Sequence, residues 1–545
     1  MGSSHLRKMK RREGQKNGPS PSNEPTGVQN RHLVDPIDAL FAQHQPFGDS
    51  DYLHEQLHVR YKNRLGKISE MLPIAGELAR ALDQANPYSQ YRIIGDPVVR
   101  YTIHQALRHV WNGTQDGLAL ARYEEIFRET LGHLAGGNRG GPLESGGVEG
   151  RRLGTEPYHG AIWSENHRDD VFGRSFRRIV HDNFPGEPLC TPSAGDLARL
   201  AKGTQLLSAL LPLCSRSAFG HTHMVVIVPN VGTWRQKASC SEFRISGTIF
   251  LNRDMLHNPW WVAEHLLHES LHQKLYDFRH THSLMAEDLS PETPPTDGAA
   301  GILSIWNVGG TDRSNAWDTF RAVAAFHVYV HLALLCVLAE RRKTELVKRF
   351  GAPDASLPAM THRREAFERA QYLGRQIKAS CGRELGVAGR LFIDWLISIL
   401  NAIDPAPPPP ESPYLHLLIH RYMVEATLVA NKKLSPELTS QLLTLVDDEA
   451  ETIRRVLLAM RAEGPDLDRL KSAMARRPDE GAEAAFLRFR SVVVRILHTL
   501  SPDGYGLQRA SPADSTAPIE KMIQAMMDGS SQQLTPLLAT AHQKS

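Results

Sequence analysis

Two histidines and a glutamate stand at the spacing of a metal-binding motif, His-Glu-x-x-His, at His268, Glu269 and His272. On a helix, residues four apart lie on one face about one turn apart, so both imidazoles can bind one metal ion. The glutamate between them reaches the same site. The motif predicts a metal-dependent reaction, although three residues specify little in a chain that has 26 histidines.

The helix that must carry this motif is marked at its start. Asn258 can cap the free backbone amides, and Pro259 suits the first helical position, where no N–H is needed. Before this helix, two runs of β-forming residues predict strands at 224–229 (MVVIVP) and 245–252 (ISGTIFLN). In metallopeptidase-like folds a strand beside the motif helix borders the cleft and pairs with an extended peptide. A peptide substrate therefore fits this order of elements.

A catalytic metal site of this kind also needs a third protein ligand. A helix predicted at 315–342 has a nearly continuous apolar middle that contains His327 and His331. Burying an imidazole without a partner costs about 1–3 kcal/mol, and a nearby metal site would supply partners for both. We predict His327 as the third ligand and hold His331 in reserve. The alternative is that both are core histidines with other partners.

Other candidates for the third ligand fit less well. The HExxHxxGxxH extension is absent, because Leu275 and Phe278 occupy the positions of its glycine and its third histidine. Glu292 stands among prolines in a predicted loop, whereas a glutamate ligand is expected on a second helix. His280 and His282 follow the predicted end of the motif helix.

One stretch of the chain, 245–338, resembles a known family. It contains HESLHQKLYD, then a Gly-rich connection with a tryptophan, then the helix WDTFRAVAAFHVYVHLAL. In this it is similar to the bacterial HExxH-motif family of peptide-modification proteins from ribosomal-peptide biosynthesis. The resemblance implies an α-ketoglutarate-dependent, non-haem iron β-hydroxylase. By position it implies His268, His272 and His327 as iron ligands, and Arg321 as the basic residue that enters the downstream helix.

Two enzyme classes therefore stay open. In a zinc metallopeptidase, Glu269 would be the general base that takes a proton from water. In an iron oxygenase, the far carboxylate of α-ketoglutarate needs a cation, which Arg321 or Arg313 could supply through a planar two-bond contact. Glu269 would then lie beside the ligands. A third interpretation is a non-enzymatic helical interaction protein with an accidental motif.

The remaining pattern predicts a mainly α-helical fold with a small α+β, zincin-like metal-binding core and extra helical regions at both ends. Hydrophobic residues make up 41% of the 545, which is enough for a sizeable core. The predicted organisation is a disordered basic tail at 1–31, an N-terminal helical region at 32–215 with a Gly-rich loop at 136–154, the catalytic core at 216–342, and a C-terminal helical region at 343–545 with a Pro-rich spacer at 405–413.

Composition constrains the partners and the location of the protein. The formal net charge of +3 gives no strong signal for nucleic acid or for a membrane surface. The five scattered cysteines are typical of reduced thiols. The apolar run at 322–339 contains two histidines, which favours a buried core helix over a membrane span. We expect a cytoplasmic enzyme with a peptide or amino-acyl substrate, and leave its oligomeric state open.

Overall fold

The computed structural model is mainly helical, with 73% helix and one mixed five-stranded sheet. This confirms the prediction of a mainly α fold with a small α+β part. The described residues are 35–113, 117–144, 152–155, 157–165, 169–186, 189–235, 237–286, 301–304, 316–353, 363–404, 412–430, 434, 436–460, 462, 464–500, 521–523 and 525–526.

The sheet is built from five short strands in the order β1-β2-β3-β5-β4. The strands are β1 (Arg152–Thr155), β2 (Tyr158–Ile162), β3 (Met224–Val228), β4 (Ser239–Ser241) and β5 (Thr248–Asn252). The central pairs are parallel, whereas β1 and β4 run antiparallel to their neighbours at the two ends of the sheet. Strands β3 and β5 are buried along their whole length, as expected of parallel strands covered on both faces.

The motif helix is α10 (Pro259–Thr281), and it begins as the sequence predicts. The side chain of Asn258 accepts a hydrogen bond from the backbone amide of Trp260, 2.9 Å away, and Pro259 occupies the first helical position. Residues on nearly every side of α10 are buried, because α8, α9, α2, α11 and the sheet all contact it. This packing fixes the direction in which the motif side chains point.

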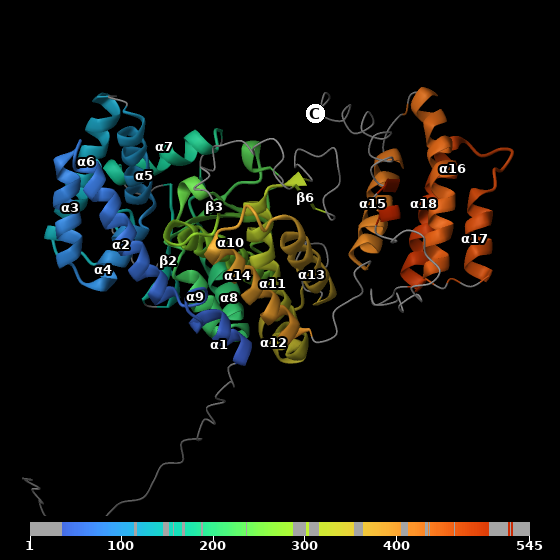
Figure 1. Ribbon diagram of the computed structural model, residues 1–545, viewed down its shortest axis with the longest axis horizontal. Coiled ribbons are helices and arrows are strands. Elements are labelled where there is room, and N and C mark those ends of the chain that lie inside the picture. Colours follow the sequence, from blue (N-terminus) through green and yellow to red (C-terminus); the bar gives the residue numbers. More distant parts are fainter. Residues whose placement is uncertain are drawn as a thin grey trace, which may run out of the picture.

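Helices that precede the motif in the sequence and helices that follow it both cover this core. Those before the motif are α1 (Pro36–Gln43), α2 (Ser50–Ile68), α3 (Pro73–Gln84), α4 (Pro87–Gly95), α5 (Pro97–Asn112), α6 (Gly117–Ala135), α7 (Val171–Asn183), α8 (Ala194–Leu210) and α9 (Pro212–Phe219). Figure 1 shows α2 to α6 gathered together, and their apolar faces join those of α7 and of one face of the sheet in one cluster.

The second helix that bears histidines is α11 (Thr319–Arg341), and it packs against α13 (Arg363–Ser380) and α14 (Val387–Ile403). By length and composition alone α11 could cross a membrane, but 89% of its most apolar 18-residue segment is buried inside the protein. Short strands β6 (Ile302–Leu303) and β7 (Ala316–Trp317) pair just before it, and α12 (Lys343–Phe350) follows it.

The C-terminal helices form a group of their own in Figure 1. They are α15 (Ser412–Ala430), α16 (Pro436–Ala459), α17 (Gly464–Met474) and α18 (Ala482–Leu500). At their centre the buried guanidinium of Arg490 pairs with the carboxylates of Glu425 and Glu449. The cation lies between two carboxylates of opposite charge, so the cluster is explained by the packing of the helices.

The structure differs from the sequence-based expectation in the strands. Two of them, β1 and β2, lie in the region expected to be helical, and β1 includes the end of the segment expected to be a Gly-rich loop. Strand β4 was not predicted, and Ile245 lies in a 3₁₀ turn before β5 rather than in the strand. Helix α9 crosses the expected boundary at 215, while α12 begins at Lys343 as expected. The 1–31 tail and most of the Pro-rich spacer lie outside the described residues.

Candidate metal centre

Three motif side chains come together on one face of α10. The ligand atoms of His268, Glu269 and His272 all lie within 4.8 Å of one another. The two imidazole rings are nearly perpendicular, with their centroids 4.9 Å apart. Both histidines are half-buried and Glu269 is buried. Among the residues that the structure describes, this is the group of histidine, cysteine or carboxylate side chains whose spacing suits a metal ion.

The protonation of His272 favours metal binding. Burial, and then the neighbouring His268, hold the pKa of His272 well below its ordinary value, so its imidazole is neutral and keeps a lone pair. Its Nδ1 atom is buried and has no hydrogen-bond partner. An unpartnered buried nitrogen in a neutral imidazole costs free energy unless something binds it. The donor set therefore fits a divalent transition metal.

Glu269 is held in place by the edge strand. The hydroxyl of Ser239 in β4 donates a hydrogen bond of 2.6 Å to Oε1 of Glu269. Strand β4 ends the sheet beside α10, which it contacts. The carboxylate is thus fixed between the motif histidines and the last strand of the sheet, although neither β4 nor this bond was predicted from the sequence.

Aromatic rings and one arginine continue the motif face beyond His272. Tyr276 lies one turn further along α10, with its ring nearly parallel to that of His272 and 6.3 Å away. Its ring contacts Phe243 and Phe320. The guanidinium of half-buried Arg279 lies over both phenylalanine rings, 5.0 Å from the centroid of Phe243 and 4.2 Å from that of Phe320. The sequence could have indicated Arg279 as a site residue, because it stands seven residues after His272 and so lies on the same helical face.

On the other side of the motif, His265 stacks on Trp261, with ring centroids 4.1 Å apart. Its Nδ1 donates to the backbone carbonyl of Trp261, and burial lowers its pKa to about 3. Its ring is parallel to that of His268 at 6.1 Å. His265 therefore forms an uncharged wall of the site, one turn before the motif.

The structure does not bring His327 into the motif cluster. His327 and His331 are buried on α11, with their ring centroids 4.6 Å apart. His331 stacks on Phe41 at 3.8 Å, and its Nδ1 donates to the carbonyl of His327, so it is satisfied within the core. The ring of His327 contacts Phe392, and its Nδ1 has no partner. Its role as a metal ligand stays a prediction, and the described geometry does not support it.

The other predicted residues are spread more widely. Arg321 is exposed, and its guanidinium lies 4.9 Å from the centroid of the Trp317 ring. Arg313 and Glu292 lie outside the described residues.

The two histidines at the end of the motif helix have partners elsewhere. His280 accepts a hydrogen bond from Arg64, and the ring of His282 stacks on that of Phe278, with centroids 4.6 Å apart. Neither histidine belongs to the motif cluster.

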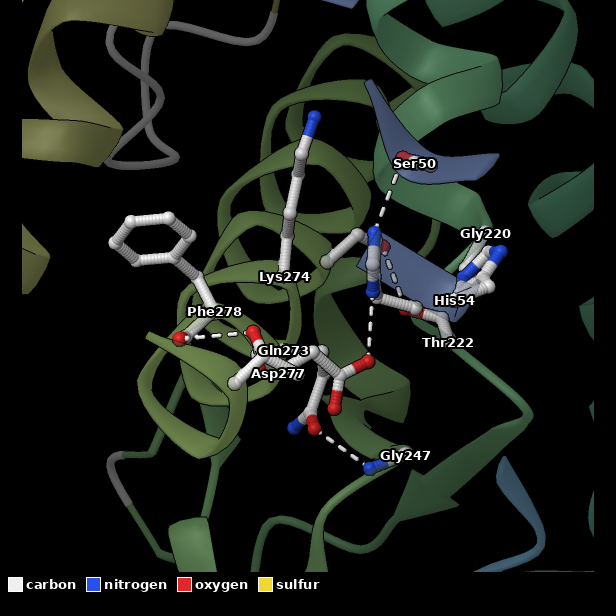
Figure 2. A network of polar contacts seen from close by, with 12 residues as sticks. Ser50, His54, Gly220, Thr222, Gly247, Gln273, Lys274, Asp277 and Phe278 are labelled. Atoms are coloured by element: carbon white, nitrogen blue, oxygen red, sulfur yellow. Dashed lines mark hydrogen bonds and ion pairs between the residues drawn. The ribbon is translucent and has the colours of Figure 1, made fainter. Parts of the chain in front are cut away.

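The opposite face of α10 is anchored by a buried polar network, and Figure 2 shows the part of it around Asp277 and Gln273. Asp277 bonds the guanidinium of Arg100 at 2.6 Å and Nδ1 of His221 at 2.7 Å. Burial alone would raise the pKa of Asp277, but these partners hold it below its ordinary value. Since Arg100 and His221 come from α5 and from the turn before β3, this carboxylate ties both to the motif helix.

Two more side chains of α10 extend this anchoring. Lys274 donates to Oγ of Ser217 in α9 at 2.7 Å, and burial lowers its pKa to about 8. Gln273 accepts a 2.6 Å bond from the amide of Gly247 and donates to the carbonyl of Thr248. Through Gln273, the helix is fixed to the start of β5, and so the motif is held in register with the sheet.

The buried network contains an acid, a histidine and a serine in the order found in serine hydrolases. His221 bonds Asp277 through Nδ1 and Ser50 Oγ through Nε2, the latter at 3.0 Å. All three are buried, however, with exposures of 0% for Asp277 and His221 and 4% for Ser50. A substrate could not reach that hydroxyl, so the network is structural.

Comparisons with known proteins assign this chain to no family. A scan against protein-family models found no match. A search of curated proteins also found no similar one.

Proposed function

We propose that this protein is an iron(II)- and α-ketoglutarate-dependent oxygenase that hydroxylates the side chain of a peptide or of a carrier- or peptide-bound amino acid in peptide natural-product biosynthesis. The observation that carries this is the donor set on α10. Two imidazoles and one carboxylate lie within 4.8 Å of one another, and both histidines are half-buried. Two histidines and a carboxylate with open positions are typical of non-haem iron oxygenases. The resemblance of 245–338 to the peptide-modification family also supports it.

In this proposal, His268 and His272 hold the iron. Glu269, expected from the sequence to lie beside the ligands, instead supplies the carboxylate of the donor set and is oriented by Ser239. The chemistry that iron and the keto acid supply when bound is insertion of one oxygen atom of O₂ into a C–H bond, while the keto acid loses CO₂ and becomes succinate. The residues of the chain bind and orient the reactants. Burial of Tyr276 and Glu269 keeps water from the inner side of the site.

A cation for the far carboxylate of the keto acid is the next requirement. The sequence predicts Arg321 or Arg313 for this role, but Arg321 is exposed and lies over Trp317. Arg279 fits better, because it shares the helical face of His272 and the aromatic rings of Phe243 and Phe320 fix its guanidinium. A guanidinium held in this way can bind a carboxylate through two parallel hydrogen bonds.

The position of β4 supports a peptide substrate and a zincin-like core. In the sheet, β4 is the end strand, it runs antiparallel to β5, and it contacts α10. An extended peptide can add to such an edge as a further strand. Ser239 of β4 contacts Glu269, so a peptide paired there would pass over the motif.

The test is turnover of the keto acid by the full chain. Purified protein is loaded with Fe(II) and α-ketoglutarate without oxygen, and oxygen is then admitted. Formation of succinate is expected, and the His272→Ala variant is expected to form none. Protein that binds only zinc and never decarboxylates the keto acid would overturn the proposal.

A zinc metallopeptidase is the second candidate, and the bond between Ser239 and Glu269 favours it. A glutamate fixed beside two histidine ligands is placed to take a proton from a water molecule during peptide hydrolysis. This alternative predicts that Glu269→Gln abolishes peptide cleavage while the metal stays bound. Cleavage that survives this substitution would exclude it.

A further inference from the structure

A basic hollow lies on the N-terminal helices, and none of its lining residues belongs to the metal-binding motif. It has a volume of about 640 Å³ and lies between α2, α3 and α5. One carboxylate, that of Glu70, belongs to its lining. Five cationic side chains line it: Arg60, Lys62, Arg64, Lys67 and Arg80. A concave surface that gathers cations raises the local concentration of anionic ligands.

Most of this positive charge is not neutralised by the protein. Lys62 pairs with Asp83 at 2.6 Å. Arg60, Lys67 and Arg80 are exposed and form no ion pair with any residue that the structure describes. The hollow therefore keeps at least three cations that can pair with a ligand. Cations that line one hollow repel one another, and an anionic partner would relieve that repulsion.

An apolar wall adjoins the charges. Trp111 lines the hollow with 62% of its surface exposed, and Leu107, one turn earlier on α5, is buried below it. A large exposed tryptophan beside several arginines is typical of binding surfaces, where Trp and Arg are the residues that contribute most affinity. The ligand that fits carries carboxylates together with an apolar or aromatic side chain.

The hollow is connected to the metal centre through α10. Arg64, from the lining, donates to Nε2 of His104 at 2.9 Å and to Nδ1 of His280 at 3.3 Å. The ring of His280 contacts Phe243 at 4.9 Å, and Phe243 contacts Tyr276, which stacks beside His272. Contacts between side chains thus run from the hollow to the motif.

We propose that this hollow binds an acidic segment of the peptide substrate, at a distance from the residue that is modified. The inference rests on the proposed function, because it assumes that the substrate is a peptide. Carboxylates at alternate positions of an extended peptide point to the same side and can meet the cations of α2 and α3, while an apolar residue packs on Trp111. The segment adds affinity without entering the metal centre.

The test is a binding measurement that needs no turnover. The full chain, stripped of metal with a chelator, is titrated with three fluorescent probes: a peptide rich in Asp and Glu with one aromatic residue, the same peptide with Asn and Gln, and a single-stranded oligonucleotide of equal charge. Only the acidic peptide is expected to bind. Its affinity should fall as salt is raised.

Charge reversal locates the binding site. The triple variant Arg60→Glu, Lys67→Glu, Arg80→Glu is expected to weaken binding of the acidic peptide at least tenfold, because three exposed charge pairs become repulsions. A matched control reverses three exposed cations of the C-terminal region and makes the same change in net charge: Arg455 in α16, Lys471 in α17 and Arg477 in the connection between α17 and α18. This control should bind like the wild type. All six side chains are exposed, and the thermal midpoint of each variant checks that it is folded.

Three results would overturn the inference. The first is equal binding of the acidic and the Asn/Gln peptides. The second is a triple variant that binds no worse than the control, and the third is an oligonucleotide that binds more tightly than the acidic peptide. The last result would assign the hollow to nucleic acid. Since the assay uses metal-free protein, failure of the iron chemistry leaves the binding result intact, and the two proposals fail separately.

Discussion

Ser239 donates a 2.6 Å hydrogen bond to Glu269, and this bond joins the last strand of the sheet to the metal-binding motif. The two residues are 30 positions apart and belong to β4 and α10. Buried Glu269 would otherwise pay the full cost of losing water around a carboxylate. The bond therefore both stabilises the carboxylate and sets its direction, whichever metal the site holds.

Removing this hydroxyl should lower activity without removing the metal. Ser239→Ala leaves Glu269 free to turn from the site, so the rate should drop about 10–100-fold, as for other residues that orient metal-site groups. Ser239→Thr keeps a hydroxyl and should recover most of the rate. Steady-state kinetics and metal content of the two variants measure this. Equal rates for Ala and wild type would show that the bond orients nothing essential.

The Asp277 network should be essential for stability. Asp277→Asn removes the charge that balances buried Arg100, and an unbalanced buried charge lowers the free energy of unfolding by about 3–5 kcal/mol. Asp394→Asn is the matched control, since Asp394 pairs with Lys378 where both side chains are more than half exposed. Its loss should be below about 1 kcal/mol. Thermal unfolding of both variants measures the difference, and similar midpoints would contradict the structural role of the network.

His331 should make the protein less stable in acid. Burial lowers its pKa to about 3 in the folded state, against about 6.5 in an unfolded chain. As pH falls from 6.5 toward 3, the unfolded state binds a proton that the folded state does not, so stability declines by up to about 1.4 kcal/mol per pH unit.

Replacing that imidazole should remove its share of the pH dependence. In His331→Phe, the new ring can stack on Phe41 as the imidazole does. Urea unfolding of metal-free protein at pH 7 and pH 5 should therefore show a smaller decline for this variant than for the wild type. The exposed His498→Phe serves as the matched control. A decline as large as that of the wild type would mean that His331 is protonated in the folded protein.

Two arginines are candidates for the cation that binds the far carboxylate of α-ketoglutarate, and substituting each of them distinguishes the two. Arg279→Gln should weaken binding of α-ketoglutarate about tenfold or more, because a charged two-bond contact to the carboxylate is lost. Arg321→Gln should change it little, since that side chain is exposed over Trp317. Keto-acid affinity of the iron-loaded variants measures this. The reverse order of effects would restore Arg321 to the role that the resemblance implies.

Local signals in the sequence predicted the elements of the site well. The cap and proline at 258 and 259 mark the start of α10, and the β-forming run at 224–229 marks β3, which ends one residue earlier. The histidine spacing placed His268 and His272 on one face. Each of these features depends on residues within a few positions, where periodicity and turn chemistry are informative.

The missed features depend on long-range contacts. Strand β2 pairs with β3 some sixty residues later, and it contains a glycine and a histidine rather than a β-branched run. Strand β4 has three residues, too few for alternation to be visible. Helix α11 is buried on nearly all sides, so its pattern could not show which neighbour His327 faces. The partners of Asp277 come from two distant segments, which no local pattern indicates.

Metal stoichiometry tests the central claim most directly. The full chain is loaded with Fe(II) or Co(II) without oxygen, desalted and measured for metal per chain, together with His268→Ala, His272→Ala and His327→Gln. We expect one metal ion per chain in the wild type and in His327→Gln, and none retained in the two motif variants. Loss of metal in His327→Gln as well would make that histidine the third ligand. A wild type that binds no stoichiometric metal, or motif variants that bind it equally well, would contradict a metal centre at this site.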